Sequence, residues 1–214
     1  AILVAPFLER SYAMFASLAG TWLPLAMIFA ASAATGALLS LPPTRRRILA
    51  WMATPEEQVE PLPGDDLLPG DSGTTHAITV AAPPDSVWPW LAQMGYGRAG
   101  WYSHDRLDHG GRPSAEEIRP ELQAIRPGDL LPSTADGRTG FEVVDLREGA
   151  HLVLGFHMAR PFRPARWAEP SSRISQRATW AFALRPAGPA STRLLVRARA
   201  RSRPAWLWAP WDAF

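Results

Sequence analysis

One short segment, His104-Asp105-Arg106-Leu107-Asp108-His109, concentrates most of the chemically capable side chains of this chain. His104 and Asp108 are four residues apart, so a helix would place them on one face. A zinc site needs a third protein ligand, however, and no HExxH motif accompanies them. We therefore expect no metal and interpret the segment as polar surface. The alternative is an acid/base pair at a pocket mouth, with His104 and Asp105 as the catalytic candidates.

A second candidate is rich in glycine, because Gly95-Tyr96-Gly97-Arg98-Ala99-Gly100 matches the pattern GxGxxG. Dinucleotide binding needs these glycines between a strand and a helix. Here a predicted helix precedes them and Trp101-Tyr102-Ser103 follows. The pattern therefore predicts a helix end and a tight turn, and no cofactor is expected.

Other reactive chemistries have little support in the sequence. The chain contains no cysteine, lysine or asparagine, which excludes thiolate metal sites, cysteine nucleophiles and Schiff-base lysines. It also lacks a GxSxG elbow, a Walker loop and an EF-hand loop. His151 and His157 share one face of a predicted strand, and we interpret that face as solvated.

Periodicity predicts the elements that must position these residues. Pro83-Pro84-Asp85 opens a helix that runs to Met94, with Trp88 and Leu91 on one face and Gly95 as its stop. Alternating patterns predict strands at Thr74–Val80, Phe141–Leu146, His151–Met158, Ser175–Leu184 and Thr192–Arg203. One early helix followed by consecutive strands predicts an α+β domain with an antiparallel meander.

The last predicted strand has two very different faces. Val196, Ala198 and Ala200 share one face, and the other carries four arginines, Arg197, Arg199, Arg201 and Arg203. The arginine row must be solvated or paired, either within the fold or with a membrane surface, and no nucleic acid is expected. The small residues leave space behind the sheet, as a ligand cavity requires. The alternative is that Trp180, Phe182 and the helix tryptophans fill this space.

The N-terminal region carries a candidate membrane anchor. Residues 11 to 44 contain no charged side chain, and about 20 apolar residues span a bilayer core. We predict a transmembrane helix at about Thr21–Leu41, with Arg45, Arg46 and Arg47 holding its end at the cytoplasmic side. A cleaved signal peptide and a buried core helix are the alternatives.

This anchor gives a three-part organisation and a location at the cell membrane. Residues 1–44 form the anchor region, whose apolar start at Ile2–Leu8 is compatible with an earlier span. Residues 45–73 are expected to be a juxtamembrane segment and a Pro/Gly-rich linker, typified by Pro61-Leu62-Pro63-Gly64-Asp65-Asp66. Residues 74–214 form the folded domain, which is expected to face the cytoplasm.

Several motifs from residue 54 onward follow one another in a recognisable order. Ile78-Thr79-Val80-Ala81-Ala82-Pro83-Pro84 runs into Val87-Trp88-Pro89-Trp90-Leu91 and then Gln93-Met94-Gly95. Gly100-Trp101-Tyr102-Ser103, Thr179-Trp180-Ala181-Phe182 and Thr192-Arg193-Leu194-Leu195-Val196-Arg197 complete the series. This succession resembles the SRPBCC superfamily, which contains START lipid-transfer domains and polyketide cyclase-like proteins.

The resemblance implies a helix-grip fold, in which a curved antiparallel sheet wraps a long C-terminal helix around an apolar cavity. Only the first turns of that helix fit between Arg203 and Phe214, so we expect it to be truncated here. The resemblance implies no shared reaction, because the superfamily includes carriers as well as enzymes.

We therefore predict a membrane-tethered module that binds an apolar or amphipathic small molecule, such as a lipid or a polyketide-like compound. The expected apolar lining is Trp101, Tyr102, Phe141, Phe156 and Trp180, with Arg98 or His104 at a polar mouth. Two alternatives remain: an enzyme of the cyclase or hydratase kind that uses His104 and Asp105, and a membrane-surface or protein-interaction module that uses the arginine row.

Overall fold

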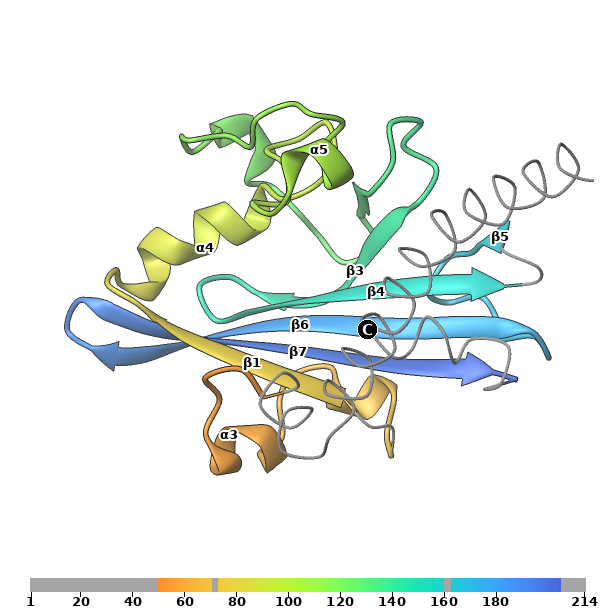
Figure 1. Ribbon diagram of the computed structural model, residues 1–214, viewed down its shortest axis with the longest axis horizontal. Helices are drawn as coiled ribbons and strands as arrows, with labels where there is room; N and C mark the ends of the chain where they lie inside the picture. The colour runs from red at the N-terminus through yellow and green to blue at the C-terminus, as the bar shows by residue number, and fades with distance from the viewer. Residues whose placement is uncertain (1–49, 71–72, 160–162, 205–214) are drawn as a thin grey trace, which may run out of the picture. The chain divides into compact units, whose positions relative to one another are not determined.

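An antiparallel sheet of seven strands organises the protein, in the order β1-β7-β6-β4-β3-β2 with β5 paired to β4 (Figure 1). The computed structural model describes residues 50–70, 73–159 and 163–204. The strands are β1 (Gly73–Val80), β2 (Leu130–Pro132), β3 (Gly140–Arg147), β4 (His151–Ala159), β5 (Arg163–Pro164), β6 (Ser175–Gly188) and β7 (Ser191–Arg203). The helices are α3 (Pro55–Val59), α4 (Pro84–Ala92) and α5 (Asp105–Asp108), with short 3₁₀ turns η1 (Asp65–Leu67) and η2 (Pro120–Leu122).

The five predicted strands and the predicted helix are all present, and the curved sheet with few helices fits a helix-grip fold. The predicted transmembrane helix at 21–41 and the closing C-terminal helix lie outside the described residues. Among the helices of 50–70, 73–159 and 163–204, none is long and apolar enough to cross a membrane.

The side of the sheet that α4 covers, here called the inner face, carries the main hydrophobic core. Pro84 begins α4 at a position that needs no backbone N–H, and the spacing of Val87, Trp88 and Leu91 turns all three toward the sheet. They form one core with Leu152 and other buried residues of β2, β3, β4 and β6: Leu131, Val143, Leu154, Phe182 and Leu184. Each such side chain stabilises the fold by about 1.5–3 kcal/mol when fully buried.

The opposite side, here called the outer face, is covered by residues 50–70. Leu62 packs with Ala77, Ala183 and Leu195 in a second, smaller core. Because this segment covers the outer face of β1, Thr75 and Ala77 are buried, whereas Ile78 on the inner face is 49% exposed. Figure 1 shows α3 and α4 on opposite sides of the sheet.

Arg197 of β7 holds this covering segment in place. Its side chain is 3% exposed, and its guanidinium donates to the backbone oxygens of Glu57 (2.8 Å), Gln58 (3.1 Å) and Glu60 (2.8 Å). It also donates to Thr75 Oγ1 (2.9 Å) and to Asp65 Oδ2 (2.6 Å). A guanidinium has five N–H donors, so these five bonds match its capacity. Glu57 and Gln58 lie in the last turn of α3, whose carbonyls have no partner within the helix.

The neighbouring arginines repeat the same pattern. Arg193 pairs with Glu57 at 2.8 Å, Arg199 pairs with Asp65 at 2.8 Å, and Arg185 of β6 pairs with Glu60 at 2.6 Å. Arg197 and Arg199 of the arginine row are thus paired with an acidic side chain of the fold, as one of the sequence alternatives proposed. Residues 50–70 differ from the linker expected over 45–73, because their carboxylates and free carbonyls bind these arginines.

Replacing Arg197 with methionine should therefore lower the free energy of unfolding by about 3–5 kcal/mol, the usual cost of removing one partner of a buried ion pair. Equilibrium unfolding in urea measures this loss. Arg147→Met, an exposed arginine on the outer face of β3, is the matched control and should change stability by less than about 0.5 kcal/mol. Equal losses in the two variants would contradict the role given to Arg197.

Glu57 should make stability depend on pH. A hydrogen bond from Arg193 lowers the pKa of this carboxyl from 4.5 to about 2, against the opposing effect of burial. The unfolded chain then binds more protons between these values, so the contribution of Glu57 is complete above pH 4.5 and is lost as the pH falls toward 2. Unfolding experiments across this interval should show a shallower pH dependence for Glu57→Gln than for the wild-type protein. Identical slopes would show that the pair has no such effect.

Candidate functional site

Five aromatic side chains gather on the inner face, and we call them the aromatic cluster: Trp101, Phe141, Phe156, Trp180 and Phe182. The rings of Trp101 and Trp180 stack with centroids 6.0 Å apart, and Phe141 lies 5.4 Å from Trp101 and 5.7 Å from Trp180. Phe156 and Phe182 extend the cluster on either side, at 6.0 Å from Phe141 and 4.8 Å from Trp180. All of them except Phe182 are only half-buried.

Next to the aromatic cluster lies a floor of small side chains, here called the alanine strip: Ala178, Ala198 and Ala200. The register sets Ala178 of β6 opposite Ala200 of β7, and Trp180 opposite Ala198. Ala198 and Ala200 are exposed. The alternation of β7 therefore places small residues inward and arginines outward, as the sequence predicts.

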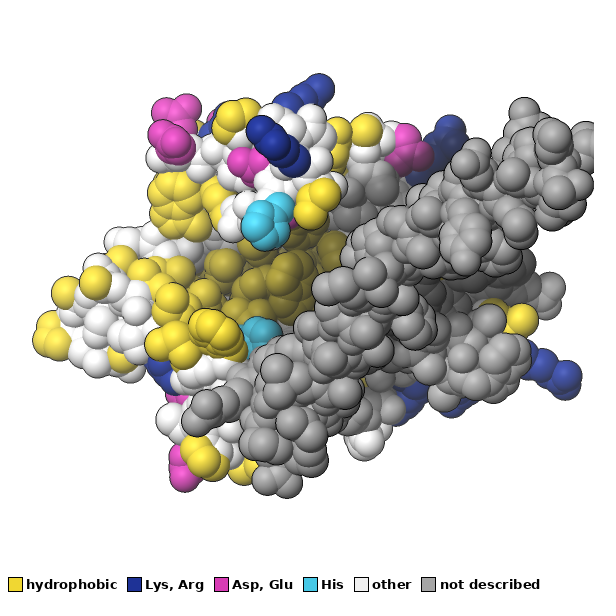
Figure 2. Space-filling view, viewed as in Figure 1, with side chains coloured by type: hydrophobic (Ala, Val, Ile, Leu, Met, Phe, Trp, Pro, Cys, Tyr) yellow, Lys and Arg dark blue, Asp and Glu magenta, His cyan; other side chains and the backbone are white. Residues whose placement is uncertain are grey.

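Among the described residues, the inner face is closely packed at one end and less closely packed at the other. Toward α4, Leu152, Leu154 and Phe182 are closely packed core residues. Farther along the same strands, Phe156 and the alanine strip lie outside that core. Figure 2 shows hydrophobic side chains gathered in a hollow of this surface. Thus, among the described residues, the core beneath α4 does not extend to Phe156 and the alanine strip.

A buried polar hub fixes the elements above the aromatic cluster. Gln93, which is fully buried, donates from Nε2 to the hydroxyl of Tyr102 at 2.5 Å and to the backbone oxygen of Glu117 at 3.1 Å. Its Oε1 accepts from the backbone N–H of Arg119 at 2.9 Å. These bonds tie the end of α4 to the segment that carries Trp101. The hub therefore positions one wall of the aromatic cluster.

The glycine motif forms the tight turn that its pattern predicts. Gly95 and Gly100 exchange backbone hydrogen bonds of 3.0 and 3.1 Å, and Gly95 has φ +130°. A Cβ at Gly100 would come within 2.3 Å of Ser114 Oγ, so the turn requires a residue without a side chain there.

Arg98 and Tyr102 do not lie where the sequence reasoning placed them. The guanidinium of Arg98 donates to the backbone oxygens of Met94, Ala92 and Leu122 at 2.9–3.0 Å, and burial lowers its pKa. Arg98 thus binds the end of α4 and is not at a polar mouth. Tyr102 packs its ring edge against Trp90 at 5.7 Å, while burial raises the pKa of its hydroxyl. It is therefore outside the aromatic cluster.

His104 and Asp105 line an open depression of about 570 Å³ beside α5, together with Ser103, Arg106, Leu107, Gly111 and Pro113. No strand contributes to this lining. The carboxylate of Asp105 accepts from the hydroxyl and the backbone N–H of Ser114 at 2.6 and 3.1 Å, and these bonds lower its pKa. The carboxylate of Asp105 therefore stabilises the loop between residues 105 and 114.

The two strand histidines also differ from the solvated face that we expected. Both lie on the outer face, where His151 pairs with Asp145 at 3.0 Å and His157 is 3% exposed. Nδ1 of His157 lies 3.0 Å from the backbone oxygen of Arg166. The interpretation fails because residues 163–170 cover this part of the sheet. Within the ranges that the structure describes, no three histidine or acidic side chains are grouped to hold a metal ion.

No family model and no curated protein sequence matches this chain. Solved structures that it is similar to include the Mll3558 protein from Rhizobium loti, at 14% identity over 66% of this chain and 88% of that one, with a TM-score of 0.35. The protein jhp0584 from Helicobacter pylori aligns at 14% identity over 70% and 82%, with a TM-score of 0.36. Norcoclaurine synthase from Thalictrum flavum aligns at 13% identity over 71% and 82%, with a TM-score of 0.24. The fold description therefore rests on the strand order alone.

The sequence analysis named four of the five aromatic residues of the cluster but not the polar residues next to it. It quoted Gln93 only as part of a motif, because the hydrogen bonds of Gln93 join it to residues some 25 positions away in the chain. His76 lies on the inner face of β1, opposite Val196, and its alternation with Thr75 and Ala77 gave the signal that could have placed it. His76 supplies a polar side chain at the β1 edge of this surface.

Proposed function

We propose that this protein binds an apolar or amphipathic small molecule, such as a lipid or a polyketide-like compound, on the inner face of its sheet. The observation that carries the proposal is the aromatic cluster, which remains half-exposed beside the alanine strip. Soluble domains rarely expose contiguous apolar surface unless it binds something. Ligand sites are typically lined by aromatic and aliphatic side chains with few polar groups.

The shape of this surface also supports a ligand. The cross-strand neighbours of Trp180 on β7 and of Phe156 on β6 are alanines, which fill less space than the large side chains of a packed interior. The rings present flat apolar walls and the alanine strip leaves room for a bound molecule. His76 at the β1 edge would meet the polar end of an amphipathic ligand.

The proposal includes a location at the cell membrane. A helix at about Thr21–Leu41 would tether the module, and Arg45, Arg46 and Arg47 would keep it on the cytoplasmic side. A tethered carrier would meet its ligand in or near the bilayer, where apolar molecules accumulate.

The two alternative functions receive less support from the geometry. An acid/base reaction would need Asp105 turned toward the aromatic cluster, but its carboxylate binds Ser114. An interaction surface built on the arginine row would need those side chains accessible, but Arg197 is buried and Arg199 is paired with Asp65. Ligand binding on the inner face is therefore the function we propose.

Photo-crosslinking tests this site directly. The full chain in a neutral detergent, exposed to a fatty acid that carries a diazirine and then irradiated, should be labelled in β4 and β6 near Phe156 and Trp180. Ala198→Trp should fill the floor of the site and reduce this labelling by about tenfold, which corresponds to about 1.4 kcal/mol of binding free energy.

The matched control is Ala187→Trp, which adds the same side chain at an exposed position of the β6–β7 hairpin and should leave the labelling unchanged. Labelling confined to residues 11–44 in the wild-type protein would rule out the inner face as the site, because it would show only that the apolar segment takes up the probe.

A further inference from the structure

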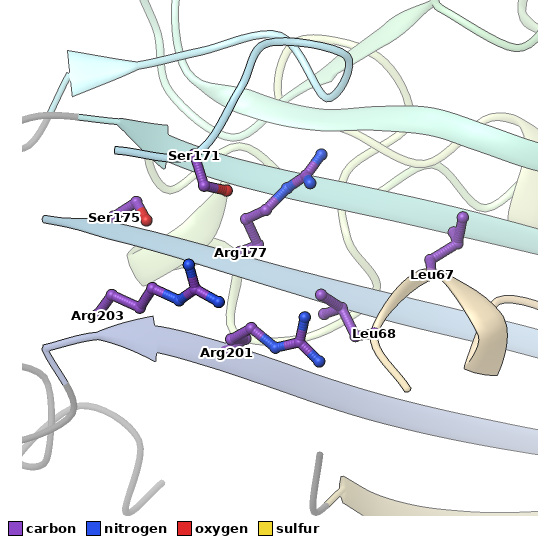
Figure 3. Close-up of a pocket in the computed structure, with 7 residues that line it drawn as sticks. All are labelled: Leu67, Leu68, Ser171, Ser175, Arg177, Arg201 and Arg203. Atoms are coloured by element: carbon purple, nitrogen blue, oxygen red, sulfur yellow. The ribbon is translucent and has the colours of Figure 1, made fainter. Parts of the chain in front are cut away.

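Three arginines converge at the far end of the outer face, away from the aromatic cluster. The β6–β7 register sets Arg177 opposite Arg201 and Ser175 opposite Arg203, so all four side chains share that face. They line a pocket of about 70 Å³ together with Ser171, Leu67 and Leu68. Figure 3 shows Arg201 and Arg203 reaching from β7 toward Arg177 and Ser175 of β6, with Ser171 in the preceding loop.

We propose that this pocket, here called the arginine pocket, binds a phosphate group or a similar tetrahedral oxyanion. The guanidinium fork matches phosphate oxygens, and charge-assisted hydrogen bonds of this kind are about twice as strong as neutral ones. Serine hydroxyls can donate to the remaining oxygens. The volume suits a small ionic group, because sites for organic ligands measure about 300–1,000 Å³.

The charges next to Arg177 point the same way. Burial lowers the pKa of Arg177, and the positive charge of Arg201 lowers it further. A bound anion would relieve this repulsion.

Two of the arginines are already held in position. The guanidinium of Arg177 lies 4.0 Å over the ring of Trp167 and donates to its backbone oxygen. Gly155 makes room for Trp167, since a Cβ there would lie 2.6 Å from its ring. Arg201 donates to the backbone oxygen of Pro69 at 2.7 Å. The Nε of Arg177 is buried and bonds to no residue that the structure describes. A donor that is fixed in place loses little conformational freedom on binding.

Calorimetry with inorganic phosphate tests the proposal on the full chain in a neutral detergent. The wild-type protein should bind phosphate, and Arg203→Gln should raise the Kd by about tenfold or more. Arg147→Gln removes the same charge elsewhere on the outer face and should leave the Kd unchanged. Arg201→Gln provides a second variant, and the thermal stability of the wild-type protein in phosphate against chloride at equal ionic strength provides a measurement that needs no variant.

The phosphate could be free or belong to a lipid headgroup, and a second titration separates these sources. Vesicles of phosphatidylcholine, with and without phosphatidic acid, are added to each variant. A loss of phosphatidic acid-dependent binding in Arg203→Gln alone indicates a headgroup, whereas an effect on inorganic phosphate alone indicates a free anion. The proposal is overturned if wild-type protein shows neither interaction, or if Arg147→Gln weakens both as much as Arg203→Gln does. None of these outcomes depends on a ligand at the inner face.

Discussion

The buried guanidinium of Arg197 is the constraint on which the rest of the structure depends. It lies on the outer face of a strand, where a charge without partners would be very costly. The segment 50–70 removes that cost by bringing α3 carbonyls and the Asp65 carboxylate to the guanidinium, which Thr75 of β1 also contacts. The segment must therefore fold onto the sheet, although its composition is typical of a linker. A second hydrophobic core follows from this contact.

The strict alternation of β7 links this outer constraint to the inner face. Because successive residues point to opposite sides, a row of arginines outward leaves Val196, Ala198 and Ala200 inward. On β7, outward side chains therefore make polar contacts with segment 50–70, and the inward side chains are small. The hydrophobic packing under α4 and the contacts of the outer face stabilise the sheet, while the end of the inner face that carries Phe156 lies outside the α4 core.

The sequence predicted the strands, and the face of the sheet to which each side chain points, better than it predicted the polar contacts between distant segments. Period-two patterns placed β1, β3, β4, β6 and β7, and the same alternation identified the aromatic side chains that share the inner face. Long-range polar contacts were not predictable, because nothing near Arg98 in the chain indicates that it binds the carbonyl of Leu122, 24 residues away. Burial of His157 depends on the loop at 163–170, whose position above β4 has no local sequence signal.

The central claim is that the inner face holds an apolar molecule, and native mass spectrometry of the full chain purified from its own cells tests it most directly. After release from detergent, the wild-type protein and Ala187→Trp should each carry the added mass of one apolar compound, and Ala198→Trp should lack it. A ligand-free wild-type spectrum that remains unchanged after exposure to lipid extracts would contradict the claim.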